Sequence, residues 1–207
     1  MTRCCRICSL PAVLIYKETR PFYACNRCGL IFTDCRLTRQ EVEKHYRDQY
    51  HHPCDWEGEA AVLLSWVAPF KKADPPSSSI MDFGSGNGGL TRALRKMGFS
   101  VDCYEPMIHG EFQRKDYPRL YEVVILNEVI EHLQDINLTM DFLSDLLTAG
   151  GLTIIKTLLT DWMINDPYRF VQHFRHWWYK DDPTHISFFS SLTFEYLCGD
   201  PSRNLEV

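Results

Sequence analysis

The cysteines near the N-terminus are spaced as they are in a metal site. Cys5 and Cys8 form one C-x-x-C pair and Cys25 and Cys28 form a second, with 16 residues between the pairs. Two such pairs are typical of tetrahedral zinc sites, in which each pair places two thiolates on one side of a tight turn. We therefore predict a zinc ion bound by Cys5, Cys8, Cys25 and Cys28. Four protein ligands leave no open position, so its role would be structural.

The remaining cysteines of this region leave alternatives open. Cys4 lies four residues before Cys8 and competes with Cys5 as a ligand, whereas Cys35 and Cys54 are expected to be free thiols. Four reduced cysteines without a metal are the other interpretation. Disulfides are disfavoured, because the chain has an odd total of 9 cysteines and six of them lie in the first 35 residues.

The segment that carries these cysteines is predicted to be a small ribbon. Apolar stretches on either side of "KETR" indicate a hairpin between the two pairs, and Gly29 stands where such a turn often needs a positive φ. So small a ribbon buries little core, and zinc would supply its folding free energy. We place the ribbon at residues 1–36, a helix and linker at 37–56 and the main domain at 57–207.

The stretch "IMDFGSGNGGL", residues 80–90, contains a glycine loop with two possible spellings. Gly84, Gly86 and Gly88 fit G-x-G-x-G, whereas Gly84, Gly86 and Gly89 fit G-x-G-x-x-G, the dinucleotide fingerprint. In both, a strand ends at glycines that let the backbone approach a ligand at the N-terminus of the next helix. A Walker phosphate loop is excluded, because no Gly-Lys-Ser/Thr follows.

Polar residues around this loop strengthen its interpretation as a ligand site. Asp82 stands two residues before Gly84, and Glu105 ends the next predicted strand, 21 residues after Gly84. A carboxylate at about this distance can accept both hydroxyls of a ribose, in NAD and in S-adenosylmethionine alike. Asn127 ends the third predicted strand, and Glu128 follows it directly.

Hydrophobic periodicity indicates the elements that position these residues. Strands are expected at 80–83, 100–106, 121–128 and 152–159. Helices are expected from Thr38, where a capping box begins, from Leu90 to Met97, and from Leu133 to Leu147. A linker is expected at 51–58, and Gly150 and Gly151 are expected to stop the last helix. Strands that alternate with helices predict an α/β fold with a Rossmann-like, mostly parallel sheet and helices on both faces.

Composition limits the classes of partner. The chain has 207 residues, 45% hydrophobic and 24% charged, which suits one α/β domain with a small appendage. A net charge of −5 disfavours a broad nucleic-acid surface, although it leaves room for a local basic patch. No apolar run reaches the roughly 18 residues of a membrane span, and the N-terminus has no apolar core of signal-peptide length, so a cytoplasmic location is expected.

Five segments in order carry a family resemblance. "IMDFGSGNG", "VDCYEP", "EVVILNEVIEHL", "LLTAGGLTIIKT" and "DDPTHISFFS" resemble the successive signature segments of class I S-adenosylmethionine-dependent methyltransferases, over Ser78 to Leu197. The cysteine ribbon resembles one that precedes this domain in some bacterial members. A dehydrogenase would normally need a second substrate domain, for which no room is left. The operative spelling is therefore Gly84, Gly86, Gly88.

The resemblance implies a cofactor site for S-adenosylmethionine. Gly84, Ser85 and Gly86 would wrap its methionine end and ribose, Asp82 would anchor the loop or a cofactor-bound water, and Glu105 would grip the ribose diol. S-adenosylhomocysteine would be the product.

The segments after the loop complete the implied site. Pro106 and Met107 would flank the adenine, and Asn127 and Glu128 would lie beside the methionine amino group and the sulfonium. The 15 residues from Pro106 to the start of the next strand are too few for the helix and strand that the family usually has there. The third strand is therefore expected to be missing or vestigial.

The candidate catalytic residues are His132, His185 and Glu128, with a histidine as general base. Glu128, Glu131 and His132 spell E-x-x-E-H, expected at a helix start. The motif resembles a metal-binding segment of small-RNA 2′-O-methyltransferases and some quinone O-methyltransferases, with His185 as a further ligand. Magnesium or manganese is thus an alternative, but we favour a role in which Glu131 and His132 orient the loop by hydrogen bonds.

Three functions follow from these features. The first is a methyltransferase that acts on a small-molecule acceptor. The second is an RNA methyltransferase whose basic ribbon grips the nucleic acid; the basic residues are Arg3, Arg6, Lys17, Arg20, Arg27 and Arg36. The third is a non-catalytic interaction protein with a degenerate domain. An aromatic helical face, Phe170, Phe174 and Trp177 with His173, is interpreted either as a lid over the acceptor or as a face packed on a sheet.

Overall fold

The computed structural model describes residues 2–49, 54–70, 77–164, 166 and 168–199. Contacts group the chain into two compact units: the first is Met1–His45, Ile130–Met140 and Thr157–Val207, and the second is Tyr46–Val129 and Asp141–Lys156. The cysteine segment therefore shares its unit with two later stretches of the chain. The domain boundaries expected at residues 36 and 56 stay a prediction.

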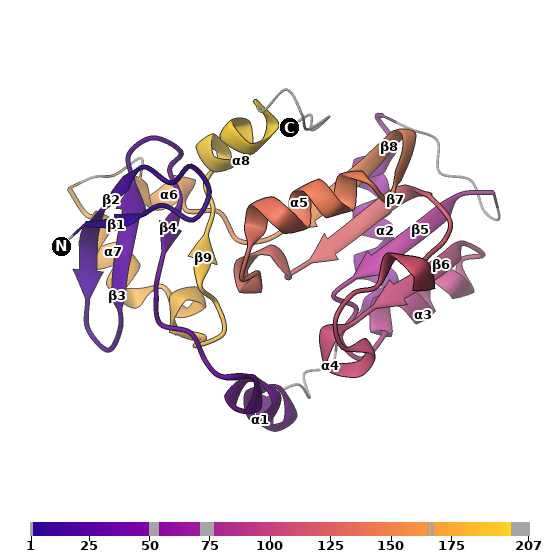
Figure 1. Cartoon of the computed structure of the whole chain (residues 1–207), viewed down its shortest axis with the longest axis horizontal. Coiled ribbons are helices and arrows are strands. Elements are labelled where there is room, and N and C mark those ends of the chain that lie inside the picture. The colour runs from indigo at the N-terminus through magenta and orange to yellow at the C-terminus, as the bar shows by residue number, and fades with distance from the viewer. Residues whose placement is uncertain (1, 50–53, 71–76, 165, 167, 200–207) are drawn as a thin grey trace. The chain divides into compact units, whose positions relative to one another are not determined.

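The first unit contains an antiparallel sheet of five strands (Figure 1). Its strands are, in spatial order, β1 (Thr2–Cys4), β2 (Pro11–Lys17), β3 (Pro21–Cys25), β4 (Ile31–Phe32) and β9 (Ser187–Phe188). Strands β2 and β3 form the predicted hairpin, with Lys17 opposite Pro21. The sequence did not predict β9, which pairs Phe188 with Ile31 and completes the ribbon sheet from the far end of the chain.

Short helices surround this sheet. They are η2 (Ile130–His132), α6 (Asp161–Ile164), α7 (Phe170–His176), η3 (Trp178–Asp181) and α8 (Ser191–Cys198). Phe174 of α7 is buried in one cluster with Phe22 of β3 and Phe188 of β9. The aromatic face of α7 thus packs on the ribbon sheet, which is the second of the two interpretations of that face. Helix α1 (Arg39–Gln49) begins at the predicted capping box, in which the Thr38 N–H donates to Glu41 at 2.8 Å.

The second unit contains a parallel sheet of four strands in the order β6-β5-β7-β8. The strands are β5 (Ser79–Phe83), β6 (Ser100–Tyr104), β7 (Tyr121–Asn127) and β8 (Leu147–Lys156). Between β6 and β7, a stretch that is described throughout, the chain forms only α4 (Pro106–His109) and η1 (Arg114–Asp116). The predicted α/β fold without a third strand is therefore confirmed.

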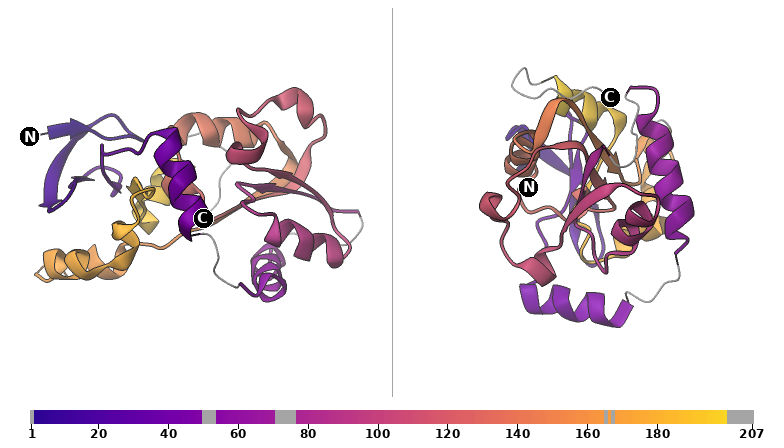
Figure 2. Two further views of the ribbon diagram at one scale, coloured as in Figure 1. Left: turned by 90° about the horizontal axis from the view of Figure 1, so that it is seen from below. Right: turned by 90° about the vertical axis from the view of Figure 1, so that its right-hand side faces the viewer.

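Helices cover both faces of this parallel sheet (Figure 2). On one side α2 (Trp56–Val67) and α3 (Gly89–Lys96) share a core with alternate strand residues, among them Ile80, Val123 and Ile125. The intervening residues Val124 and Leu126 are also fully buried and face the other side, where the last turn of α5 (Ile136–Ser144) lies. In the described part of the chain, every helix is too short or too polar to cross a lipid bilayer.

Several predicted boundaries were wrong. The strand expected at 152–159 is β8, which runs from Leu147 to Lys156. Helix α2 begins at Trp56, capped by the Asp55 carboxylate, so the linker expected at 51–58 ends earlier; residues 51–53 lie outside the described residues. The helix expected to run to Leu147 ends at Ser144, because Leu147 already pairs with Tyr121 in β8. The two glycines expected to stop that helix lie inside β8, where the register with β7 shifts.

The outer edge of β6, which a third strand would cover, is capped by side chains instead. Arg95 donates to the Val101 carbonyl at 2.7 Å, and the Tyr117 hydroxyl donates to the Cys103 carbonyl at 3.1 Å. The Tyr117 ring also stacks on Phe112, with 4.7 Å between ring centroids. Capped carbonyls on an edge strand leave fewer free groups for pairing with another chain.

We predict that Tyr117→Phe lowers the free energy of unfolding by about 1 kcal/mol, because it removes one hydrogen bond to the edge and keeps the ring contacts. Urea unfolding measures the change. Tyr168→Phe is the control, since Tyr168 is 99% exposed, and should change the free energy by less than about 0.5 kcal/mol. Equal effects of the two substitutions would contradict the capping role.

Candidate functional site

The glycine loop between β5 and α3 needs glycine at three positions. Gly84, Gly86 and Gly88 have φ values of +80°, +53° and +74°, in the left-handed region that other residues rarely adopt. A Cβ at Gly84 would also lie 2.5 Å from a methyl carbon of Val129. Gly89 has no positive φ and is the first residue of α3. The backbone therefore matches the Gly84, Gly86, Gly88 spelling.

Glu105 holds this loop against the end of β6. One of its carboxylate oxygens accepts from the Gly86 N–H at 2.8 Å, and the other accepts from the Met107 N–H at 3.1 Å. The Tyr104 carbonyl accepts from the N–H groups of Gly84 and Ser85 at 2.7 and 2.9 Å. Each carboxylate oxygen keeps a further lone pair, so Glu105 can accept hydroxyls of a ligand while it fixes the loop.

Pro106 and Met107 form the first turn of α4 directly after Glu105. Pro106 is exposed and Met107 is half-buried. The Glu105 carboxylate caps this short helix, so the same side chain orders the glycine loop and the segment predicted to flank the adenine.

Asp82 is buried at the end of β5 and ties the two ends of the loop together. Its carboxylate accepts from the Thr91 hydroxyl of α3 at 2.5 Å. Burial raises the pKa of Asp82 to about 6, against the opposing effect of the Thr91 hydrogen bond. The resemblance implied that Asp82 anchors the loop or a cofactor-bound water; this contact is consistent with the first role, which stays a prediction.

The end of β7 brings a polar side chain and a strained backbone together. The Oδ1 atom of Asn127 is buried and has no hydrogen-bond partner among the described residues. Glu128 has a φ of +56°, and its N–H donates to the Lys156 carbonyl at 2.9 Å. Uncompensated polar atoms and left-handed backbone at a non-glycine residue are both costly, and they concentrate at ligand sites.

The helix start expected for E-x-x-E-H is absent. Glu128 adopts a left-handed turn, and Ile130–His132 forms a short 3₁₀ helix instead. Glu128 belongs to the second unit, whereas Glu131 and His132 belong to the first.

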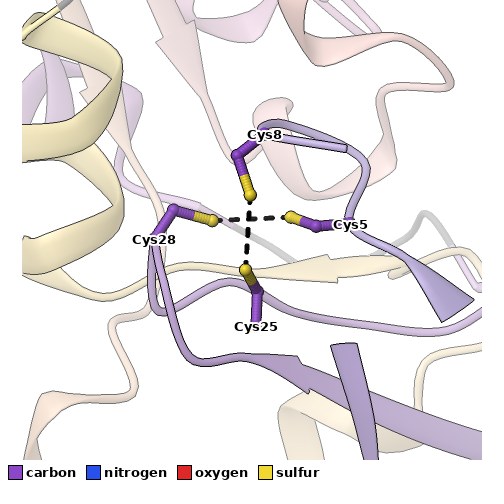
Figure 3. A group of neighbouring side chains, drawn as sticks. All are labelled: Cys5, Cys8, Cys25 and Cys28. Atoms are coloured by element: carbon purple, nitrogen blue, oxygen red, sulfur yellow. Dashed lines mark hydrogen bonds between the residues drawn. The ribbon is translucent and has the colours of Figure 1, made fainter. Parts of the chain in front are cut away.

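The four predicted zinc ligands converge (Figure 3). The Sγ atoms of Cys5 and Cys28 lie 3.4 Å apart, as do those of Cys8 and Cys25, and all four lie within 4.8 Å of one another. Sulfurs bound at a Zn–S distance of 2.3 Å in a tetrahedron would be about 3.8 Å apart, so the donor set fits this ion. The alternative ligand Cys4 is exposed and outside the group.

The two C-x-x-C turns have the same backbone form. Ser9 and Gly29, which follow the second cysteine of each pair, have φ values of +59° and +73°. Their N–H groups donate to the carbonyls of Cys5 and Cys25 at 3.0 and 2.9 Å. The positive φ expected at Gly29 is confirmed. Within the cluster, the hydrogen bond from Cys28 lowers the pKa of Cys5 to about 5, which favours the thiolate form of Cys5.

A second group of side chains joins His132 and His185, two of the three predicted catalytic residues. Their rings are 4.7 Å apart, and a ligand atom of each lies within 4.8 Å of a carboxylate oxygen of Glu131. His132 Nδ1 lies 3.2 Å from the Thr184 carbonyl, and His185 Nδ1 lies 2.7 Å from the Tyr179 carbonyl. Carbonyls only accept, so both Nδ1 atoms carry the proton and both Nε2 atoms keep a lone pair.

Burial controls the protonation of this group. Burial, together with the positive charge that His185 can carry, lowers the pKa of His132 to about 4. His132 is therefore neutral at pH 7. A neutral imidazole with a fixed tautomer can accept a proton, accept a hydrogen bond or bind a cation through Nε2.

Sequence reasoning missed two residues that complete the histidine group. The Tyr179 hydroxyl donates to Glu131, and Asp182 accepts from Thr184 at 2.8 Å and lies 3.3 Å from His45 Nε2. The segment "DDPTH" contains both the acid and the histidine, and an Asp before Pro-Thr is a turn signal that could have indicated Asp182. Tyr179 stands in an aromatic run and has no comparable signal.

The family model described as "Methyltransferase domain" matches residues 56–200. The chain belongs to this methyltransferase family. The family predicted from the sequence is therefore confirmed, and the match includes the glycine loop, Glu105 and Asn127. No curated protein shows significant sequence similarity to this methyltransferase-domain chain.

Several solved structures resemble it in fold. Streptomyces venezuelae DesVI is 15% identical over 60% of this chain and 59% of its own, with a TM-score of 0.39. CalS10, an amino pentose methyltransferase from Micromonospora echinaspora, is 15% identical over 61% and 60%, with a TM-score of 0.40. The plantazolicin methyltransferase BpumL is 15% identical over 78% and 70%, with a TM-score of 0.48. The chain thus spans less than two thirds of the length of the first two.

We predict that Asp82→Asn removes a pH dependence of stability. Burial raises the Asp82 pKa from 3.8 to about 6, so the folded protein retains a proton that the unfolded chain releases. The free energy of unfolding therefore falls as pH rises through this window. Between pH 4 and pH 7.5, the free energy of unfolding of Asp82→Asn should rise by about 2–3 kcal/mol relative to that of the wild type.

Urea unfolding at the two pH values measures this gain. The exposed Asp48→Asn is the matched control. If the difference in the free energy of unfolding between wild type and Asp82→Asn were the same at both pH values, the pKa of Asp82 would not be raised by burial.

Proposed function

We propose that the protein transfers a methyl group from S-adenosylmethionine to a small-molecule acceptor and releases S-adenosylhomocysteine. The observation that carries this proposal is the Gly84–Gly88 loop fixed by Glu105, in a chain of the methyltransferase-domain family. When bound, the cofactor supplies an electrophilic methyl group on its sulfonium. The protein's own residues bind the cofactor, orient the acceptor and accept a proton where the acceptor must lose one.

The loop and the strand ends fit the cofactor chemically. We assign Gly84, Ser85 and Gly86 to its methionine end and ribose, because a side chain at these glycines would fill the cradle or strain it. Glu105 has acceptor capacity left for the ribose hydroxyls. The buried Oδ1 of Asn127 lacks a donor among the described residues, and the ammonium group of the methionine end would provide one.

The other predicted residues take supporting roles in this proposal. Asp82 anchors the loop through Thr91. Pro106 and Met107 flank the adenine, and Glu128 lies beside Asn127 at the sulfonium end. None of these roles requires a charge to be buried without a partner.

His132 and His185 are proposed to serve the acceptor. In their neutral forms each Nδ1–H points at a backbone carbonyl, which makes Nε2 the ring atom that can accept a proton. Magnesium is a poor match, since it prefers oxygen ligands in an octahedron and this group offers two nitrogens and one carboxylate. We therefore keep the hydrogen-bonding and base roles, with a manganese-type ion as the alternative.

The contacts of the basic ribbon residues favour a small acceptor over RNA. Arg6 donates to the carbonyls of Leu133 and Gln134, Arg20 donates to the carbonyl of Asp182 at 2.7 Å, and Arg3 pairs with Asp34 at 2.6 Å. Guanidinium groups engaged within the protein contribute less to a phosphate-binding surface.

The ribbon is proposed to bind one structural zinc ion through Cys5, Cys8, Cys25 and Cys28. The four sulfurs converge, and two matched turns orient them. A zinc site of this kind replaces the core that a short ribbon lacks. We further propose a cytoplasmic location, where reducing conditions keep the four thiols available.

Calorimetry tests the cofactor. We expect S-adenosylmethionine and S-adenosylhomocysteine to bind and NAD not to bind. Glu105→Gln should weaken binding about 10- to 100-fold, because it removes charge-assisted hydrogen bonds to the ribose. The exposed Glu111→Gln is the control and should bind as the wild type does. A folded wild type that binds neither sulfur ligand would overturn the proposed function and leave the interaction-protein alternative.

Metal analysis tests the ribbon and the histidine group together. We expect one zinc per chain, lost in Cys28→Ser and kept in Cys35→Ser, because Cys35 is exposed and outside the cluster. A chain without zinc would refute the ribbon assignment. A second divalent ion that Glu131→Gln removes would replace the base role of the histidines with a metal role.

A further inference from the structure

Arg6 stands inside the first C-x-x-C turn, between Cys5 and Cys8. The turn fixes its backbone, because the Ser9 N–H donates to the Cys5 carbonyl and the Cys5 N–H donates to the Leu10 carbonyl at 2.8 Å. Its side chain is half-buried, and burial lowers its pKa to about 10, so it remains a cation. The direction of the Arg6 side chain therefore depends on the cysteine site.

The guanidinium group of Arg6 binds the residue that follows each of the two histidines. It donates to the carbonyl of Leu133, directly after His132, at 2.7 Å, and to the carbonyl of Ile186, directly after His185, at 3.2 Å. Further bonds reach the Gln134 carbonyl at 2.7 Å and the Ser187 hydroxyl. One planar group thus clamps two segments that are about 50 residues apart in the chain.

Other contacts make these two segments one rigid group. The Ile186 N–H donates to the Glu131 carbonyl at 2.9 Å, and His132 bonds to the Thr184 carbonyl. From the same cysteine turn, the Ile7 carbonyl accepts from the Asn137 side chain at 2.8 Å. Elsewhere in the ribbon, Arg20 donates to the Asp182 carbonyl and the Thr33 N–H donates to the Ile186 carbonyl. From the first cysteine turn, Arg6 reaches the segments that follow both histidines, and Ile7 accepts from Asn137.

We propose that Arg6 is a positioning residue, which transmits the geometry of the cysteine ribbon to the His132–His185 pair. This rests on the proposed function, in which that pair serves the methyl acceptor. A guanidinium presents its donors in a fixed plane and so can hold several carbonyls at once, whereas an ammonium is a point donor. Lysine at position 6 would therefore keep the positive charge but could not bind the same set of carbonyls.

Substitution of Arg6 should therefore affect the acceptor step and leave cofactor binding unchanged. The described hydrogen bonds of the Arg6 side chain all go to the segments that follow the two histidines, so cofactor affinity should not depend on it. Misplaced histidines should slow the step in which the acceptor is oriented or deprotonated, and small displacements of such groups cost up to about 100-fold in rate.

Arg6→Gln, Arg6→Lys and the control Arg3→Gln test this. Arg3 lies in the same ribbon and makes an exposed ion pair with Asp34. A long-range proton–nitrogen NMR spectrum reports the imidazole signals of His132 and His185. These signals should shift in both Arg6 variants and remain unchanged in Arg3→Gln. All three variants should retain one zinc per chain. With an active acceptor, kcat should fall about 10- to 100-fold while the KM for S-adenosylmethionine changes less than about twofold.

Wild-type imidazole signals in a zinc-loaded Arg6→Gln protein would overturn the proposal. Should Arg6→Gln fail to fold, Arg6→Lys decides by the same criterion. The spectrum reports on the histidines without turnover, so a protein that fails to transfer methyl groups refutes the proposed function and still leaves the positioning role open to test.

Discussion

The pairing of β9 with β4 is the contact on which the first unit depends. Each strand contributes two residues to this pairing. Ile31 and Phe32 lie opposite Phe188 and Ser187, and all four residues are buried. This short ladder adds the segment after His185 to the sheet that carries the cysteines. The aromatic core of Phe22, Phe174 and Phe188 then fills the space beneath, which a ribbon alone would leave open. The four clustered cysteines, the two histidines and Arg6 are consequently parts of one unit.

The second unit obeys a different constraint, the meeting of strand ends in a parallel sheet. Asp82, Glu105 and Asn127 each stand at or beyond the carboxyl end of a neighbouring strand, and the glycine loop has to turn within the space between them. Asp82 accepts from Thr91 across the loop, and Glu105 caps α4 and accepts from Gly86. Asn127 presents a buried amide oxygen. The conformational strain falls on Glu128 and on the glycines, where a ligand would be closest to the backbone.

Local patterns predicted what depends on local physics. The parallel strands, the hairpin, the cysteine pairs and the missing third strand could all be predicted, since periodicity, glycine positions and spacing determine them. The pairing of β9 could not, because only two residues and a contact 157 positions away define it. The end of the helix before Leu147 was missed for the same reason: pairing with Tyr121 outweighed helical periodicity. At the histidine group, Tyr179 donates to the distant Glu131 carboxylate and Arg6 donates to distant carbonyls, and no spacing rule specifies either contact.

The β9 contact also orders the events of biosynthesis. All four cysteine ligands lie within the first 28 residues, so they leave the ribosome long before the segment from Thr184 to Phe188 is made. Chains fold from the N-terminus as they emerge. The thiol site can therefore assemble on a nascent chain before the residues that complete the histidine pair have been made. The histidine pair is in this way completed after the cysteine cluster, and a chain that stops before His185 keeps the four cysteines but lacks the pair.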